Sequence, residues 1–129
     1  SFVAPGVRIL AVDDNPMNLA VLRGLLKKTE MQVDLVQSGL EAIAAVQKER
    51  YDMILMDHMM PKMDGIETMK QIRRLAGNQN PMAPIIVLTA NATAGSQKQY
   101  IEEGFDDYLA KPVQSEKLEQ MIFEYLPKA

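Results

Sequence analysis

Near the N-terminus stands the stretch Arg8-Ile9-Leu10-Ala11-Val12-Asp13-Asp14, in which a short apolar run leads directly into two carboxylates. The run is apolar at nearly every position, whereas a strand with one solvated face would alternate apolar and polar residues. Residues 85–88, which read Ile-Ile-Val-Leu, repeat the pattern before Thr89. Near-continuous apolar strands of this kind predict a parallel sheet that is covered on both faces.

The whole chain alternates between strand-like and helix-like segments. The segments that separate the strands show the helical spacing of apolar residues, which is weakest over residues 93–103. This alternation predicts a flavodoxin-like (βα)5 domain of the α/β class, a five-stranded parallel sheet of order 2-1-3-4-5 with helices on both faces. Residues 77–84, rich in Gly, Asn and Pro, are expected to form a loose surface loop. The five expected strands are residues 7–12, 32–36, 53–56, 85–88 and 107–110.

The composition limits the classes of function. The chain has 129 residues, which is enough for one domain with its own core. Its 14 basic and 17 acidic residues give a net charge of −3 without a basic run, which argues against direct binding of nucleic acid. Cysteine is absent, so thiolate metal sites and cysteine nucleophiles are excluded.

The sequence also suggests a compartment and a domain boundary. No apolar stretch approaches the roughly 20 residues that a membrane span needs, so we expect a cytoplasmic domain without direct membrane contact. Residues 1–6 read as a linker remnant from a larger parent protein, and residues 7–129 form the predicted domain.

Chemically active residues follow four of the five predicted strands. In an open parallel sheet, ligands bind beyond the carboxyl ends of the strands, and the third strand is central in the order 2-1-3-4-5. Asp57 is therefore expected in the middle of the cluster. Neighbouring strands are about 4.8 Å apart, so Lys111 begins roughly 10 Å from Asp57, a gap that a long side chain can bridge. The residues at these ends are Asp13 and Asp14, then Asp57, then Thr89, then Lys111 with Pro112.

This set of residue types favours phosphate chemistry with a metal ion. Carboxylates crowded at one site repel one another, and a bound cation relieves the repulsion. Mg²⁺ is typically held by carboxylates, water and a substrate phosphate, which suits Asp13, Asp14 and Asp57. A carboxylate can also attack phosphorus, which makes Asp57 a candidate to form an aspartyl phosphate. Lys111 would stabilise charge on the transferred group, and Thr89 would donate its hydroxyl to a phosphate oxygen.

Several of these residues also have a purely structural explanation. Asp14 or Asn15, followed by Pro16, makes a standard helix start with a side-chain cap. Taken singly, Asp57 suits a turn, Thr89 a strand or a helix cap, and Lys111 a solvated surface. Asp13 has no such explanation, and the coincidence of all these residues at the strand ends favours a site. His58 is the single histidine, and we interpret it as non-catalytic. Residues 63–65, Met-Asp-Gly, are interpreted as a turn and helix start, and the nearby methionines as packing residues rather than metal ligands.

Four motifs, in order, carry a resemblance to a known family. They are Val12-Asp13-Asp14-Asn15, Met56-Asp57-His58-Met59-Met60-Pro61-Lys62-Met63-Asp64-Gly65, Leu88-Thr89-Ala90 and Tyr108-Leu109-Ala110-Lys111-Pro112. Together they resemble the response-regulator receiver domain of two-component signalling, and the resemblance extends over residues 7–126.

The resemblance implies a role for each motif residue. Asp57 would take phosphate from a phosphohistidine on a partner kinase or histidine phosphotransfer protein. The metal, Mg²⁺ with Mn²⁺ as the alternative ion, would be held by Asp13, Asp14, Asp57 and the backbone carbonyl of Met59. No further cofactor is expected. Thr89 and Lys111 would contact the phosphoryl oxygens, and the domain would be a phosphoacceptor switch rather than an enzyme.

The resemblance also implies how the domain switches and where it sends its signal. The Lys111–Pro112 peptide bond would be cis. Tyr108 would move inward together with Thr89, so that the fourth helix, fifth strand and fifth helix form the surface that binds the downstream protein. Met59 and Asn91 take the two positions that flank the path of the hydrolytic water in this family. Because neither side chain activates water, we expect a long-lived phosphoryl group.

Alternative functions are weighed against the same motifs. The segment Asp57-His58-Met59 lacks the second aspartate of the aspartyl-phosphate phosphatases, and the absence of a glycine-rich phosphate loop disfavours nucleotide or flavin binding. The Asp-Asp-Asn-Pro-x-Asn start of the first motif and the Leu-Thr-Ala-Asn-Ala segment of the third look most like receivers fused to hybrid histidine kinases. A free-standing response regulator remains the alternative, followed by a receiver-like interaction domain that is never phosphorylated.

Overall fold

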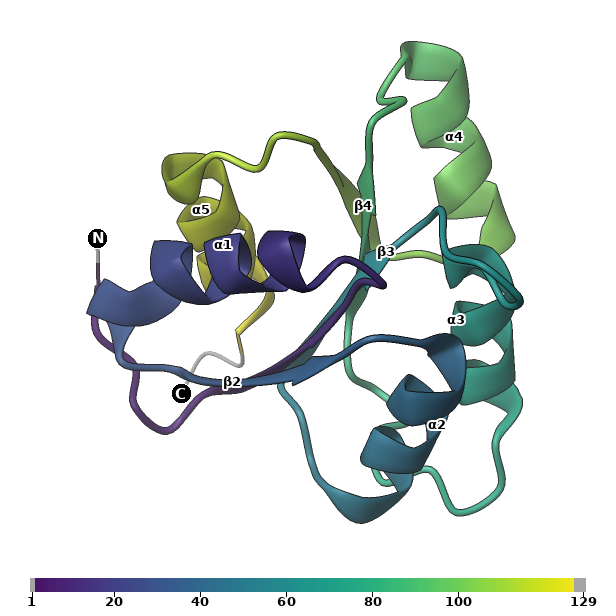
Figure 1. Cartoon of the computed structure of the whole chain (residues 1–129), viewed down its shortest axis with the longest axis horizontal. Coiled ribbons are helices and arrows are strands. Elements are labelled where there is room, and N and C mark those ends of the chain that lie inside the picture. Colours follow the sequence, from purple (N-terminus) through teal and green to yellow (C-terminus); the bar gives the residue numbers. More distant parts are fainter. Residues whose placement is uncertain (1, 127–129) are drawn as a thin grey trace.

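The computed structural model describes residues 2–126, so residue 1 of the predicted linker and residues 127–129 of the predicted domain lie outside the described part. Strands and helices alternate along this part (Figure 1). The strands are β1 (Arg8–Val12), β2 (Gln32–Val36), β3 (Met53–Asp57), β4 (Ile85–Thr89) and β5 (Asp107–Ala110). The helices are α1 (Pro16–Leu26), a short 3₁₀ helix (Lys27–Thr29), α2 (Gly39–Lys48), α3 (Gly65–Arg74), α4 (Ala94–Glu103) and α5 (Ser115–Tyr125).

The five strands form one parallel sheet in the order β2-β1-β3-β4-β5, which confirms the predicted topology. Every residue of β3 and β4 is buried, as their continuous apolar sequences predicted. The register pairs Val12 with Met56 and Asp57 with Leu88. It therefore brings the residues that end β1, β3 and β4 to one edge of the sheet.

Helices cover both faces of the sheet and divide the core into two clusters. In Figure 1, α1 and α5 lie together on one side of the strands, and α2, α3 and α4 lie on the other. Alternate strand residues point to opposite faces, so Leu55 packs with α1 and α5, whereas Met56 packs on the side of α2, α3 and α4.

Side-chain caps begin four of the helices. The cap of α1 decides between Asp14 and Asn15, which the sequence left as alternatives. Asn15, and not Asp14, caps α1, because the Asn15 side chain accepts a hydrogen bond of 2.9 Å from the Met17 N–H, with Pro16 in the first turn. Asp14 therefore does not serve as the cap of this helix. The other caps are Ser38, Asp64 and Thr93.

Two strands run one residue further than predicted, and one begins a residue later. The sheet hydrogen bonds continue to Asp57 and Thr89, since the His58 N–H donates to Leu88 (3.1 Å) and the Lys111 N–H donates to Thr89 (2.8 Å). Strand β1 starts at Arg8. The two polar site residues are therefore held by the sheet itself rather than by a loop.

The loop over residues 77–84 is less loose than predicted, because it carries a buried anchor. Asn80 is only 6% exposed. Its side chain accepts a hydrogen bond from the Tyr51 N–H (2.5 Å) and donates to the carbonyls of Val46 (3.1 Å) and Glu49 (2.7 Å). Replacing the side chain would remove a hydrogen-bond partner from each of these three backbone groups.

We expect Asn80→Ala to lower the free energy of unfolding by about 2 kcal/mol or more, because it removes buried hydrogen bonds to three backbone groups. The matched control is Gln79→Ala, since Gln79 is exposed and bonds only through its backbone. Urea unfolding of both variants measures the difference. Equal stability of the two variants would contradict the role of Asn80.

Candidate functional site

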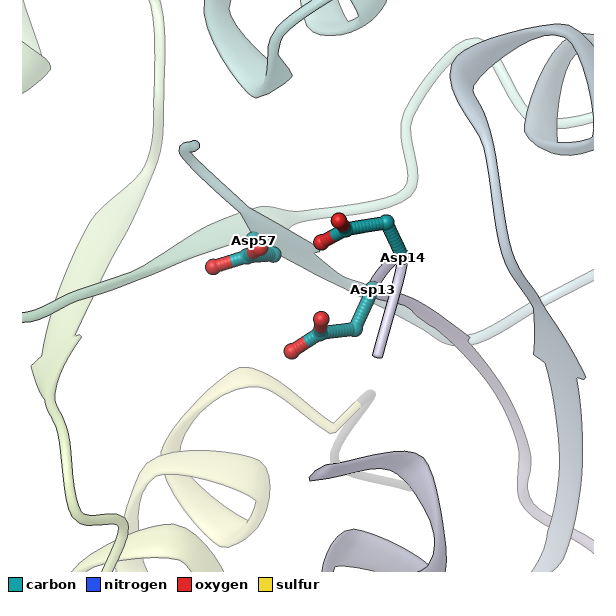
Figure 2. Close-up of side chains that lie close together, drawn as sticks. All are labelled: Asp13, Asp14 and Asp57. Carbon is teal, nitrogen blue, oxygen red and sulfur yellow. The ribbon is translucent and has the colours of Figure 1, made fainter. Parts of the chain in front are cut away.

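Three carboxylates meet where β1 and β3 end (Figure 2). Asp13 and Asp14 follow β1, and Asp57 is the last residue of the neighbouring strand β3. One carboxylate oxygen from each residue lies within 4.8 Å of the others. Asp13 and Asp57 are almost fully buried, at 1% and 4% exposure, whereas Asp14 is exposed at the mouth of the cluster. The predicted meeting of these three residues is confirmed.

The start of α1 holds Asp13 in place. One carboxylate oxygen accepts a hydrogen bond from the backbone N–H of Asn15 (2.9 Å), and the other accepts one from the side-chain amide of Asn18 (3.1 Å). The turn that joins β1 to α1 thus orients the carboxylate toward Asp57. Asn18 is a supporting residue that the sequence reasoning did not single out.

The long side chain of Lys111 reaches the three carboxylates from two strands away in the sheet, as predicted. Its ammonium forms a close ion pair with Asp57 and lies 3.5 Å from Asp13. Lys111 directly follows β5, which is separated from β3 by β4. The peptide bond between Lys111 and Pro112 is cis, as the resemblance implied.

The electrostatics of the site leave an excess of negative charge. Burial raises the pKa of Asp57 above its ordinary value, and the neighbouring charge of Asp13 adds to that rise. The hydrogen bond from Lys111 opposes the rise without cancelling it. Burial also disfavours the Lys111 ammonium, but its bond to Asp57 outweighs this, and the pKa of Lys111 is raised. One ammonium therefore does not neutralise the clustered carboxylates.

The donor set fits a hard divalent cation. Carboxylate oxygens are the ligands that Mg²⁺ prefers, and the three here lie close enough together to share one ion. Exposed Asp14 provides a route for an ion to enter the otherwise buried cluster. The backbone carbonyl of Met59 remains a predicted ligand.

Gly65 shapes the loop that follows Asp57. A Cβ atom at Gly65 would clash with the backbone carbonyl of Asp57, and the Gly65 N–H donates to the carbonyl of His58 (2.7 Å). The loop can fold back over the end of β3 only with glycine at this position. Residues 63–65 are a turn and helix start, as predicted, and they also bring α3 close to the site.

Thr89 lies on the strand beside Asp57, but its hydroxyl contacts a residue that the sequence did not indicate. The hydroxyl oxygen is 2.8 Å from the Tyr100 hydroxyl and accepts a hydrogen bond from the Asn91 N–H (2.9 Å). Tyr108, the predicted switch residue, is half-buried against the core cluster on the side of α4. The weak helical pattern over residues 93–103 concealed Tyr100, which is the buried residue of α4.

The fold and the site define a class: an α/β domain with a buried aspartate, two further carboxylates and a lysine at the carboxyl edge of a 2-1-3-4-5 sheet. The sequence pattern of the response regulator receiver domain matches residues 9–123. The chain belongs to this family, which confirms the resemblance.

Two curated relatives illustrate the likeness. The chain is 40% identical over 119 residues to the sensor protein GacS of Pseudomonas syringae pv. syringae, and equally so to the signal transduction histidine-protein kinase BarA of Escherichia coli K12. Both matches cover 92% of this chain but only 13% of the relative. The chain therefore spans about an eighth of the length of these kinases.

Solved structures agree with the fold. The receiver domain of the sensor histidine kinase PA1611 from Pseudomonas aeruginosa PAO1, solved with magnesium in its active-site cleft, is 37% identical with a TM-score of 0.81. That match covers 93% of this chain and 97% of the other. The receiver domain of Saccharomyces cerevisiae Ssk1, solved in complex with the histidine phosphotransfer protein Ypd1, is 32% identical with a TM-score of 0.83. Coverage there is 95% of this chain and 90% of the other.

Within residues 2–126, no helix is long and apolar enough to cross a bilayer.

The raised pKa of Asp57 predicts how stability without metal depends on pH. The folded chain holds the Asp57 proton more tightly than the unfolded chain does, so ionising this group destabilises the fold as pH rises from about 4 through the raised pKa. Asp57→Asn removes this effect. In EDTA, we expect the stability of the variant relative to the native chain to increase with pH and then level off.

Urea unfolding between pH 4 and pH 8 checks this expectation. The matched control is Glu102→Gln, which removes one exposed carboxylate outside the site. A native chain that instead gains stability over Asp57→Asn as pH rises would show that the pKa of Asp57 is lowered.

Proposed function

We propose that this domain accepts a phosphoryl group from a phosphohistidine onto Asp57. The observation that carries the proposal is the buried Asp57 carboxylate, clustered with two further carboxylates and paired with Lys111. The family membership supports it, as does the magnesium ion in the cleft of the related PA1611 domain. We infer that Asp13, Asp14, Asp57 and the backbone carbonyl of Met59 hold a Mg²⁺ ion. Mn²⁺ is the alternative ion.

The transfer requires an exchange of partners at Asp57. A carboxylate oxygen of Asp57 attacks phosphorus, the bond between phosphorus and the donor imidazole nitrogen breaks, and the imidazole leaves with the bonding electron pair. A bound divalent ion supplies positive charge that screens the phosphoryl oxygens from the carboxylates. Lys111 then turns from the Asp57 oxygen to a phosphoryl oxygen, and Thr89 donates its hydroxyl to another.

The donor is a histidine kinase or a histidine phosphotransfer protein. The related Ssk1 receiver, solved with Ypd1, supports a partner of this kind. Because Asp57 is only 4% exposed, any donor must contact the rim of the cluster. The elements that carry the site also expose apolar side chains: Met17 and Val21 of α1 are 75% and 55% exposed, and Met59, two residues after Asp57, is 74% exposed. We infer that the donor packs on these three side chains.

The downstream surface is α4, β5 and α5. A groove of about 640 Å³ follows these elements, with Gln97, Tyr108, Lys117 and Met121 in its lining. Its mixed apolar and charged lining suits a protein partner rather than nucleic acid. Movement of Thr89 and Tyr108 on phosphorylation would reshape this surface and so change which partner binds.

The parent protein that we favour is a hybrid histidine kinase, of which this domain is the receiver module. Support comes from the curated relatives, which are histidine kinases, although the chain covers 13% of each. Such a module is a phosphoacceptor in a phosphorelay rather than an independent enzyme, and it works in the cytoplasm, where a kinase draws phosphate from ATP. A free-standing regulator is the second candidate. The chemotaxis protein CheY4 of Vibrio cholerae supports it, because this chain covers 98% of that solved chain, with 29% identity and a TM-score of 0.83.

Intact mass after incubation with acetyl phosphate, or with a phosphohistidine donor, tests the acceptor. We expect a gain of about 80 Da that requires Mg²⁺ and is lost in Asp57→Asn. Lys111→Gln should slow the gain, whereas Lys48→Gln, at an exposed lysine that ends α2, should not. If neither donor modifies the folded native chain, an interaction domain that is never phosphorylated becomes the better assignment.

The lifetime of the phosphoryl group should depend on Met59. Its exposed thioether does not activate water, so we expect slow loss of phosphate, and Met59→Glu should accelerate the loss by about tenfold or more. Met82→Glu is the control, because Met82 is 89% exposed in the distant loop over residues 77–84. Mass spectrometry over time after removal of the donor measures both rates. Fast loss from the native chain would contradict the assignment.

A further inference from the structure

A chain of hydrogen-bonded side chains links Thr89 to α4. The Tyr100 hydroxyl lies 2.8 Å from the Thr89 hydroxyl and 2.7 Å from Nδ1 of His58. Tyr100 is 5% exposed, and its ring packs edge-on against His58 and against Phe105, with ring centroids 5.2 and 6.0 Å apart. The hydroxyl is therefore held between Thr89 and His58 in a place where water cannot easily replace either partner.

Thr89 and Asp57 project to opposite sides of the sheet. Alternation along β4 places Thr89 on the same face as Val87, which packs with Tyr100 and the α4 side of the core. Alternation along β3 places Asp57 on the face of Leu55, toward α1 and α5. Contact between the Thr89 hydroxyl and a phosphoryl group on Asp57 therefore requires Thr89 to leave Tyr100.

The distances also favour one direction of the hydrogen bonds along this chain of side chains. The Thr89 oxygen already accepts from the Asn91 N–H, and the nearest acceptor for its own proton is Tyr100 at 2.8 Å, since the Asn91 carbonyl is 3.4 Å away. The shorter distance favours a Thr89 hydroxyl that donates to Tyr100, with the Tyr100 hydroxyl donating in turn to Nδ1 of His58. His58 then carries its proton on Nε2, which faces an oxygen of Asp64 at 3.9 Å.

From this arrangement we infer that Tyr100 is a positioning residue, a latch that holds the Thr89 hydroxyl on the α4 side until a phosphoryl group on Asp57 takes it. The inference rests on the proposed role of Asp57 as phosphoacceptor. The Thr89 proton cannot be given to Tyr100 and to a phosphoryl oxygen together, so the latch bond favours the unphosphorylated state. By linkage, the phosphoryl group must weaken the tie between α4 and β4.

The first test measures the affinity for beryllium fluoride, which with Mg²⁺ mimics an aspartyl phosphate, by NMR titration of the 129-residue chain. Tyr100→Phe keeps the ring and removes the latch, so we expect affinity to rise by about 2- to 12-fold, the range of one ordinary net hydrogen bond. In a Thr89→Ala background, Tyr100→Phe should have no effect. Tyr51→Phe is the control, because this buried tyrosine also loses a bonded hydroxyl, at Asp34, but outside both the site and the proposed downstream surface.

Unchanged or weaker affinity in Tyr100→Phe would overturn the latch. So would an equal gain in the Thr89→Ala background, because a gain that does not need Thr89 cannot come from releasing it. A native chain that neither binds beryllium fluoride nor gains phosphate would overturn the proposed function and the latch together. If the native chain does accept phosphate on Asp57, but Tyr100→Phe and the native chain bind beryllium fluoride equally well, the latch is wrong and the proposed function stands.

The second test needs no variant and holds even if Tyr100→Phe does not fold. His58 is the single histidine of the chain, so its imidazole nitrogens give one unambiguous pair of ¹⁵N signals. We expect the Nε2–H tautomer in the unmodified chain. The Nδ1–H tautomer would mean that His58 donates to Tyr100 and Tyr100 donates to Thr89, which would leave the Thr89 proton free and overturn the latch.

Discussion

The ion pair between Lys111 and Asp57 is the interaction on which the site depends. It joins the end of β5 to the central strand β3 across β4, and it is the only positive charge among the described residues that contacts the clustered carboxylates. Three carboxylates against one ammonium leave the site short of positive charge. The site therefore suits a bound cation, and without one the ionised Asp57 carboxylate destabilises the fold.

The two-sided sheet gives the switch its geometry. Residues 57 and 89 end neighbouring strands, yet strand alternation points one toward α1 and α5 and the other toward α4. In the proposed function, a phosphoryl group on Asp57 draws the Thr89 hydroxyl from one side of the sheet to the other, because Thr89 is the last residue of β4 and lies at the edge of the packed core. The hydrogen bond between Thr89 and Tyr100 connects this edge of the sheet to α4, which is part of the proposed downstream surface, and His58 bonds the same tyrosine hydroxyl.

Sequence reasoning predicted most of the fold because its evidence is local or periodic. Continuous apolar runs located the strands to within a residue at each end, and the strand-end rule brought Asp13, Asp14 and Asp57 together. It did not anticipate the anchor at Asn80, whose buried partners lie 29 to 34 residues earlier in the chain. A polar residue in a loop rich in Gly and Pro carries no local sign of burial.

By itself, the sequence determined the order of the elements, the family and the residues that could carry phosphate chemistry. The first depends on the period of apolar residues along the chain, and the other two on residue types at the ends of strands. Only the tertiary structure decided which residues those groups contact. It assigned the α1 cap to Asn15 rather than to Asp14, and it placed the Tyr100 hydroxyl between Thr89 and His58. Hydrogen bonds between side chains 11 and 42 residues apart arise from packing, which has no period along the chain.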